Sequence, residues 1–200
     1  KLRLNEGWCD YFSPQLYWKE GGAQSFSALL KWWKDENIKN IHLWPGLNTV
    51  AGKSDNKPAE IIGQMSTIRR MMPKNTAGEI HYSIDGLKKN PEMLREIKKL
   101  YKEDALVPVS PWIKATKPAT PNIKVEKSSE SYKISWNSKE KVFRWVLFAK
   151  YGDIWITDVL NPDQLSKSIP ANQFGKKLNT IAIIAIDRLS NESDYAAEKF

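Results

Sequence analysis

The sequence contains very little cysteine and histidine, two residue types that often build metal and redox sites. Its 200 residues include one cysteine, Cys9, and two histidines. One cysteine excludes an internal disulfide framework and any metal site built from several thiolates. We therefore interpret Cys9 as a small buried apolar side chain, and we expect no cofactor and no metal.

Long apolar runs are also missing. No stretch approaches the ~20 apolar residues that a membrane-spanning helix requires. The first residues lack the charged and then apolar order of a secretory signal peptide. The sequence therefore predicts no membrane span, and this chain contains no signal peptide.

The net charge of +8 is not concentrated in any one segment. Proteins that bind nucleic acid usually gather lysine and arginine on one face or in one run. Here the basic residues are spread over both halves of the chain, and the lysine pairs are short, as at Lys88-Lys89 and Lys176-Lys177. We therefore expect no nucleic-acid partner.

The hydrophobic content of 41% suffices for one large core or two small ones. In the first half of the chain, short apolar strands alternate with segments whose apolar residues recur at helical spacing, which is typical of parallel strands covered by helices. The expected strands are 10–18, 41–44 and 79–84, and the expected helices are 26–33, 58–72 and 91–101. The pattern predicts an α/β domain of three consecutive βα units.

Alternation divides each expected strand between two faces, because neighbouring side chains point to opposite sides of a sheet. In the second strand Ile41 and Leu43 share one face. In the third strand Ile80, Tyr82 and Ile84 share one face. We expect these residues to face the helices. The polar and aromatic residues that alternate with them in each strand should face a barrel interior or a cleft.

Ligands of parallel α/β sheets bind at the carboxyl ends of the strands. There the sequence combines aromatic rings with amide, hydroxyl and carboxylate groups. This mixture suits a sugar, whose C–H face stacks on rings while its hydroxyls need donors and acceptors. The alternative is that the aromatic residues belong to the core. The predicted substrate-binding residues are Gln15, Tyr17, Trp18, Trp44, Asn48 and Ser83, with Asp85 as a candidate catalytic carboxylate and Glu20 as a second carboxylate on a loop.

The two histidines are expected on the same face of adjacent strands. His42 and His81, with Asp85 nearby, could in principle hold a metal ion. Two aligned ligands are one fewer than such a site needs, and a hydrogen-bonded interior role is the interpretation that we favour.

The second half of the chain changes to short alternating strands after a proline-rich connector at 108–121. Prolines stiffen that connector and exclude a helix. The strands beyond it predict an antiparallel β-sandwich over 122–200, with Trp136 and Trp145 in its core. Exposed Trp155 or Tyr151 could bind a glycan, although packing is the commoner use of such residues.

Several segments resemble the C-terminal part of a bacterial glycosyl-hydrolase-like (βα)8 barrel family that is described as a domain of unknown function. The most specific match is the run Ser13-Pro14-Gln15-Leu16-Tyr17-Trp18, followed by Leu30-Lys31-Trp32-Trp33, the Gly46-Leu47 turn, and the third strand before Asn90-Pro91. The resemblance implies the last three βα units of a TIM-type barrel at 1–107, the linker at 108–121, and a fibronectin type III-like sandwich at 122–200.

The resemblance also implies a function in carbohydrate chemistry. We expect a C-terminal fragment of a glycoside hydrolase-like protein that acts on a poly- or oligosaccharide, in an extracytoplasmic location. Glycoside hydrolysis usually needs two carboxyl groups, and the family's acidic residues would lie mainly on earlier strands, so this chain alone is not expected to be a complete enzyme. The alternative is a non-catalytic carbohydrate-binding or surface-interaction protein. Self-association through the incomplete barrel is a further expectation.

Overall fold

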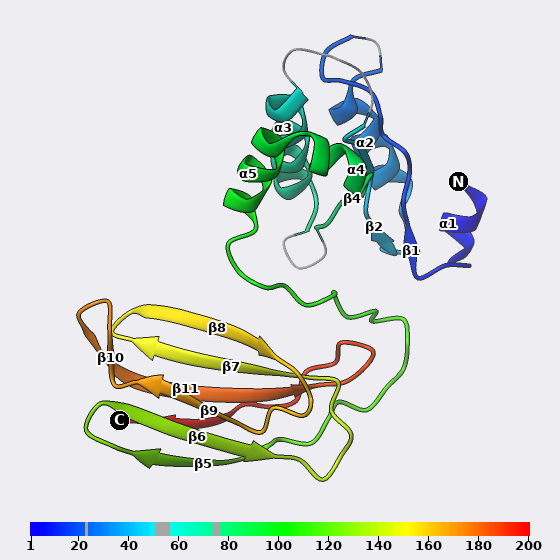
Figure 1. Cartoon of the computed structure of the whole chain (residues 1–200). Coiled ribbons are helices and arrows are strands. Elements are labelled where there is room, and N and C mark those ends of the chain that lie inside the picture. The colour runs from blue at the N-terminus through cyan, green and yellow to red at the C-terminus, as the bar shows by residue number, and fades with distance from the viewer. Residues whose placement is uncertain (23, 51–56, 74–76) are drawn as a thin grey trace. The chain divides into compact units, whose positions relative to one another are not determined.

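The computed structural model describes every residue except 23, 51–56 and 74–76. The chain divides into two compact units, Lys1–Lys102 and Glu103–Phe200. The first unit contains helices and short strands, and the second contains strands (Figure 1). Within the described residues, no helix is both long enough and apolar enough to cross a bilayer.

The first unit alternates strands and helices along the chain, as expected. Its elements are α1 (Leu2–Glu6), β1 (Tyr11–Phe12), α2 (Phe26–Glu36), β2 (His42–Leu43), β3 (Gly46–Asn48), α3 (Lys57–Met71), β4 (Ile80–Tyr82), α4 (Ile84–Lys89) and α5 (Pro91–Leu100).

The strands of the first unit are parallel, which confirms the βα pattern. β1 pairs with β2, and β3 pairs with β4, both in parallel register. An isolated parallel bridge between Gln15 and Gly46 continues the first pairing beyond β1. The neighbours across this sheet are therefore the segments 11–15, 42–48 and 80–82, in chain order.

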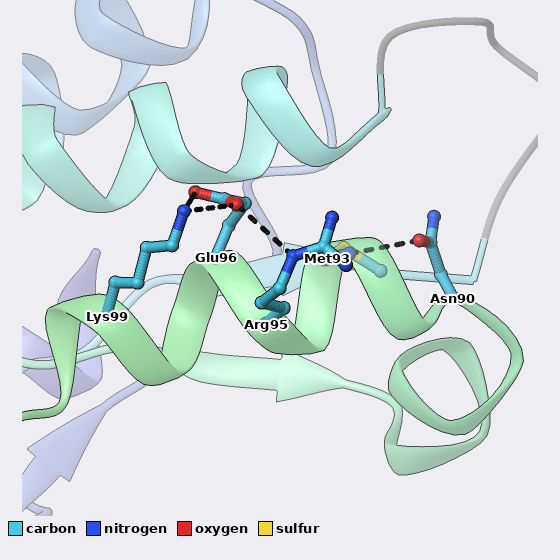
Figure 2. A network of polar contacts seen from close by, with 5 residues as sticks. All are labelled: Asn90, Met93, Arg95, Glu96 and Lys99. Carbon is cyan, nitrogen blue, oxygen red and sulfur yellow. Dashed lines mark hydrogen bonds and ion pairs between the residues drawn. The ribbon is translucent and has the colours of Figure 1, made fainter.

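Local capping determines where the longer helices begin. The Ser25 hydroxyl accepts a hydrogen bond from the Ala28 amide at the start of α2. The Asn90 side chain accepts one from the Met93 amide at 3.0 Å at the start of α5, just before Pro91 (Figure 2). Farther along α5, Lys99 donates to Glu96 at 2.7 Å. Asn90 thus caps α5, and Pro91 occupies the first turn of that helix.

The core of the first unit lies between the strands and the helices. Leu43 and Leu47 project from the second strand segment into a cluster with side chains from α2, α3 and α5. Its fully buried members are Leu16, Phe26, Leu30, Leu43, Leu47, Ile61, Met65, Ile68, Met72, Met93 and Ile97. The expectation that Leu43 faces the helices is confirmed.

The side chains of the third strand face the opposite sides of the sheet from those predicted. Its register places His81 opposite Leu47, which belongs to the core, so His81 lies on the helix side. Ile80 and Tyr82 are exposed, and Ile84 begins α4 instead of extending the strand. Aliphatic character alone suggested the wrong face: His81 is half-buried on the helix side, and its Nε2 lies 3.2 Å from the Tyr101 hydroxyl.

The second unit is an antiparallel β-sandwich. Its elements are β5 (Asn122–Lys127), β6 (Ser131–Asn137), β7 (Arg144–Tyr151), β8 (Ile154–Leu160), β9 (Ser166–Pro170), β10 (Asn172–Gln173), β11 (Lys176–Ile186) and β12 (Ala196–Lys199). One sheet has the order β10-β11-β7-β8, with β12 also paired to β11, and the other has the order β5-β6-β9.

The sandwich core lies between these two sheets. Trp136 and Trp145 are 3% and 2% exposed, and their ring centroids are 6.4 Å apart, so the prediction that both are core residues is confirmed. Tyr151 is also buried, and its hydroxyl donates to the Pro170 carbonyl at 2.7 Å. The suggestion that an exposed Tyr151 binds a glycan is therefore wrong. Trp155 remains exposed.

Candidate functional site

Four of the side chains at the carboxyl ends of the parallel strands share the face that points away from the helices. Gln15 bridges Gly46, Asn48 pairs with Tyr82, and the Tyr17 ring stacks on the Tyr82 ring with centroids 6.0 Å apart and planes at 28°. We call Gln15, Tyr17, Asn48 and Tyr82 the strand-end cluster. It combines two phenol rings with two side-chain amides.

Gly46 lies in the middle of this cluster, and its lack of a side chain leaves room for the neighbouring residues. A Cβ atom added at Gly46 would lie 3.6 Å from the Tyr17 ring and from the Gln15 Cα. Because glycine has no side chain, the Tyr17 ring lies directly beside the backbone of β3. Gly46 itself is buried, so the neighbouring side chains of the cluster cover the backbone of β3 at this point.

The Tyr17 phenol has a perturbed ionisation. Burial raises its pKa above the usual value of 10.0, and the neighbouring Tyr82 phenolate would raise it further. Tyr17 is therefore a neutral phenol at physiological pH. In that form its hydroxyl can donate one hydrogen bond and accept others.

Asn48 contributes to the local backbone as well as to the cluster. Its side-chain oxygen accepts a hydrogen bond from the Val50 amide at 3.1 Å, which turns the chain at the end of β3. Asn48 thus combines a structural role with a place on the strand-end face.

Trp44 lies lower in the sheet than the sequence suggested. β2 ends at Leu43, and a further strand, β3, follows Trp44 and Pro45 and extends to Asn48. The Trp44 ring stacks on Tyr11 and on His42, with both centroid distances 5.2 Å. Trp44 therefore follows β2 but precedes β3, and its ring belongs to an aromatic stack with Tyr11 and His42.

Trp18 and Ser83 lie next to the cluster. Trp18 is 48% exposed, and its carbonyl accepts a hydrogen bond from the Gln64 amide at 3.1 Å. Ser83 directly follows β4 at the N-cap of α4, and its carbonyl accepts a hydrogen bond from the Thr49 hydroxyl at 2.9 Å. The Tyr82–Ser83 peptide bond is cis. Both residues therefore remain near the strand ends.

The two candidate carboxylates are used elsewhere. Asp85 lies in the first turn of α4 and forms an ion pair with Lys89 at 2.8 Å, on the exposed side of that helix. Glu20 accepts a hydrogen bond from the Ser27 hydroxyl at 2.9 Å, beside the start of α2. The prediction that the third strand extends to Ile84, directly before Asp85, is wrong, because β4 ends at Tyr82 and α4 begins at Ile84. Neither carboxylate belongs to the strand-end cluster.

The two histidines are on opposite faces of the sheet. His42 shares the face of Trp44, whereas His81 lies on the helix side with Tyr101. Within the residues that the structure describes, there is no group of three or more histidine, cysteine, aspartate or glutamate side chains that could hold a metal ion. The expectation that both histidines share a face is therefore wrong. Burial lowers the pKa of His81 below its usual value of 6.5.

Tyr82 is the member of the cluster that the sequence analysis missed. Its place opposite Asn48 depends on the register between β3 and β4, which alternation within one strand does not reveal. Tyr82 can face outward only if its neighbour His81 faces the helices. The sequence allows this if another side chain can form a hydrogen bond with the His81 ring. That partner, Tyr101, lies 20 positions along the chain.

Comparisons with known proteins connect the chain to carbohydrate enzymes over part of its length. No protein-family model matches the sequence. It is 32% identical over 130 residues to Glycosyl hydrolase YngK from Bacillus subtilis (strain 168), covering 60% of this chain and 25% of that protein.

Solved structures with similar parts have low overall similarity. An FN3 domain of human collagen XX is 12% identical, with 43% of this chain and 100% of that chain covered and a TM-score of 0.33. A beta-1,2-glucanase from Parabacteroides distasonis is 19% identical, with 47% and 14% covered and a TM-score of 0.33. Scores this low support no conclusion about function. The chain is thus distantly related to a glycosyl hydrolase, and it spans about a quarter of the length of that relative.

Proposed function

We propose that the first unit supplies three consecutive βα units of a glycoside hydrolase-type (βα)8 barrel and contributes part of its sugar-binding surface. The observation that carries this proposal is the strand-end cluster, which gathers two tyrosine rings and two amides at the carboxyl ends of parallel strands. In (βα)8 enzymes that end of the strands holds the active site. The partial relationship to a glycosyl hydrolase supports the same function.

The chemistry of the cluster fits a pyranose ring. The exposed face of Tyr82, which is 57% exposed, offers a flat apolar surface for sugar C–H groups. Gln15 and Asn48 offer amide donors and acceptors for the hydroxyls around the ring. The neutral Tyr17 hydroxyl adds one more hydrogen-bonding group beside them. The cluster would therefore bind and orient a sugar.

Bond cleavage requires groups that the cluster does not contain. Glycoside hydrolysis usually uses two carboxyl groups that lie roughly 5 to 9.5 Å apart. The two candidate carboxylates of this chain are engaged at Lys89 and at Ser27. In the proposed barrel the acid and its partner carboxylate come from other βα units, and this unit supplies substrate binding.

The second candidate function is carbohydrate binding without cleavage. It is favoured by one specific observation: neither Asp85 nor Glu20 lies in the strand-end cluster. A longer chain that contains all eight βα units would distinguish the two functions. If that chain binds an oligosaccharide but releases no reducing ends, the non-catalytic function is the correct one.

The experiment that tests sugar binding is a calorimetric titration of the 200-residue chain with neutral oligosaccharides. We expect Tyr82→Ala and Gln15→Ala to weaken binding by about tenfold each, because each removes a contact worth about 1.4 kcal/mol. Trp32→Ala is the matched control, since Trp32 is a 45% exposed ring on α2, outside the cluster. Equal affinities for all four proteins, or no binding at millimolar sugar, would contradict the proposal.

A further inference from the structure

The sandwich carries a hollow on the outer face of the sheet formed by β12, β11, β7 and β8. A cavity of about 450 Å³ opens there, within the size range of small-molecule sites, which is roughly 300 to 1,000 Å³. Every described residue of its lining belongs to the second unit. The site is therefore independent of the strand-end cluster.

The strand register explains why this face is hollow. One row across the sheet consists of Ala197, Ala182, Phe148 and Thr157, which pair with one another in that order. Two neighbouring alanines leave the floor low, because each presents a single methyl group. Larger side chains occupy the adjacent rows, so the low row becomes a depression between them.

Aromatic rings form the walls of this depression. The Tyr195 ring packs on Phe148 with centroids 5.6 Å apart, and it is 59% exposed. Trp155 lines the other side and is 49% exposed. Large exposed rings around a concave surface are uncommon on a face that contacts only water. Such rings can stack against the apolar face of a ligand.

The row next to the alanines supplies polar groups. It runs Lys199, Thr180, Lys150 and Trp155 across the four strands. The Lys150 ammonium lies 5.6 Å from the centre of the ring of Trp155, which is a lining residue of the cavity. Lys199 is on the same face at the opposite end of the row. The lining itself contains no carboxylate.

We propose that this cavity binds an acidic saccharide, with a sugar ring against Trp155 and Tyr195 and a carboxylate beside Lys150 and Lys199. The rings match the C–H face of a pyranose, and the Thr157 and Thr180 hydroxyls match its hydroxyl groups. Lys150 and Lys199 lie in the row beside the cavity floor, and the described lining residues include no carboxylate, so the charges favour a negatively charged ligand over a neutral one. This site would hold a polyuronate chain through the sandwich while the first unit performs its own function.

The test is a calorimetric titration of the full chain with uronic-acid oligosaccharides and with neutral oligosaccharides of the same length. We expect the acidic series to bind, with affinity falling about tenfold in Trp155→Ala and about threefold to tenfold in Lys150→Gln, and with the latter loss shrinking at high salt. Phe174→Ala is the matched aromatic control, since Phe174 is an exposed ring of the same unit outside the cavity. Lys133→Gln on β6 is the charge control.

A third variant tests the hollow itself. Ala197→Leu keeps every ring and every charge but fills the floor of the cavity, so we expect it to abolish binding of the acidic series while the thermal unfolding of the sandwich stays unchanged. Equal affinity for neutral and acidic sugars, undiminished binding in Ala197→Leu, or absence of binding would each overturn the proposal. Sedimentation that shows a dimer disrupted by Trp155→Ala would also overturn it, because a second copy would then cover the face.

Discussion

The position of α4 against the end of β3 can be tested with one methyl group. Gly86 is buried in α4, and a Cβ atom there would lie 2.3 Å from the Thr49 carbonyl oxygen, 2.5 Å from its carbon and 2.9 Å from its hydroxyl oxygen. Contacts this short cannot be accommodated without moving backbone. The same movement would disturb the hydrogen bond from the Thr49 hydroxyl to the Ser83 carbonyl, which is 2.9 Å long. Gly86→Ala should therefore loosen the segment next to Tyr82.

The expected loss follows from three opposing contributions. Overpacking at a buried position costs about 1–3 kcal/mol, and the disturbed hydrogen bond costs about 1 kcal/mol. Alanine offsets about 1 kcal/mol, because it forms helix more readily than glycine. Gly86→Ala should then lower the free energy of unfolding of the first unit by about 1–3 kcal/mol.

Gly63 provides a control with the opposite sign. It lies in α3, is exposed, and an added Cβ would meet no atom within 4 Å. Gly63→Ala should therefore raise the free energy of unfolding by about 0.5–1 kcal/mol. The assay is urea unfolding followed by circular dichroism at the helix band, since the described helices all belong to the first unit. If both substitutions stabilise the unit, the described packing of α4 against Thr49 is wrong.

Three further predictions concern capping and ionisation in the first unit. Asn90→Ala should cost about 1 kcal/mol of its stability in the same assay, because the Met93 amide loses its cap. Stability should fall as pH drops below 6.5, because burial lowers the pKa of His81 in the folded protein and the unfolded chain therefore takes up the proton first. Unfolding curves at pH 7.5 and 5.5 measure this loss of stability. A His81→Gln variant should show a smaller difference between the two curves. Ultraviolet titration should show Tyr17 ionising above the usual 10.0, and Tyr82→Phe should lower that pKa without restoring it fully, because burial is the larger cause.

The sequence predicted the parts of the fold that depend on periodicity. The helical spacing of Leu30 and Ile97 and the strand position of Leu43 each placed a side chain in the core where the structure has it. In the sandwich, alternation around Trp136 and Trp145 identified two central rings. These predictions succeed because burial of one face is a local property of the repeat.

The features that failed depend on partners far along the chain. Alternation placed Tyr82 against the helices, but the register with Asn48 turns it the other way. A further strand, β3, follows Trp44, so its ring lies in an aromatic stack before the last strand of that segment. Cys9 is half-buried instead of buried. Pairing register and strand length are properties of the assembled sheet, so one segment read alone does not contain them.

The central claim is that the strand-end cluster binds sugar, and amide NMR of the full chain tests it most directly. A neutral oligosaccharide should shift the side-chain amide signals of Gln15 and Asn48 and the backbone amide of Tyr82, and should leave the Trp155 indole signal unchanged. The shifts should saturate with one dissociation constant. If these three signals stay in place at millimolar sugar while the protein remains folded, the account of the cluster as a sugar-binding surface is contradicted.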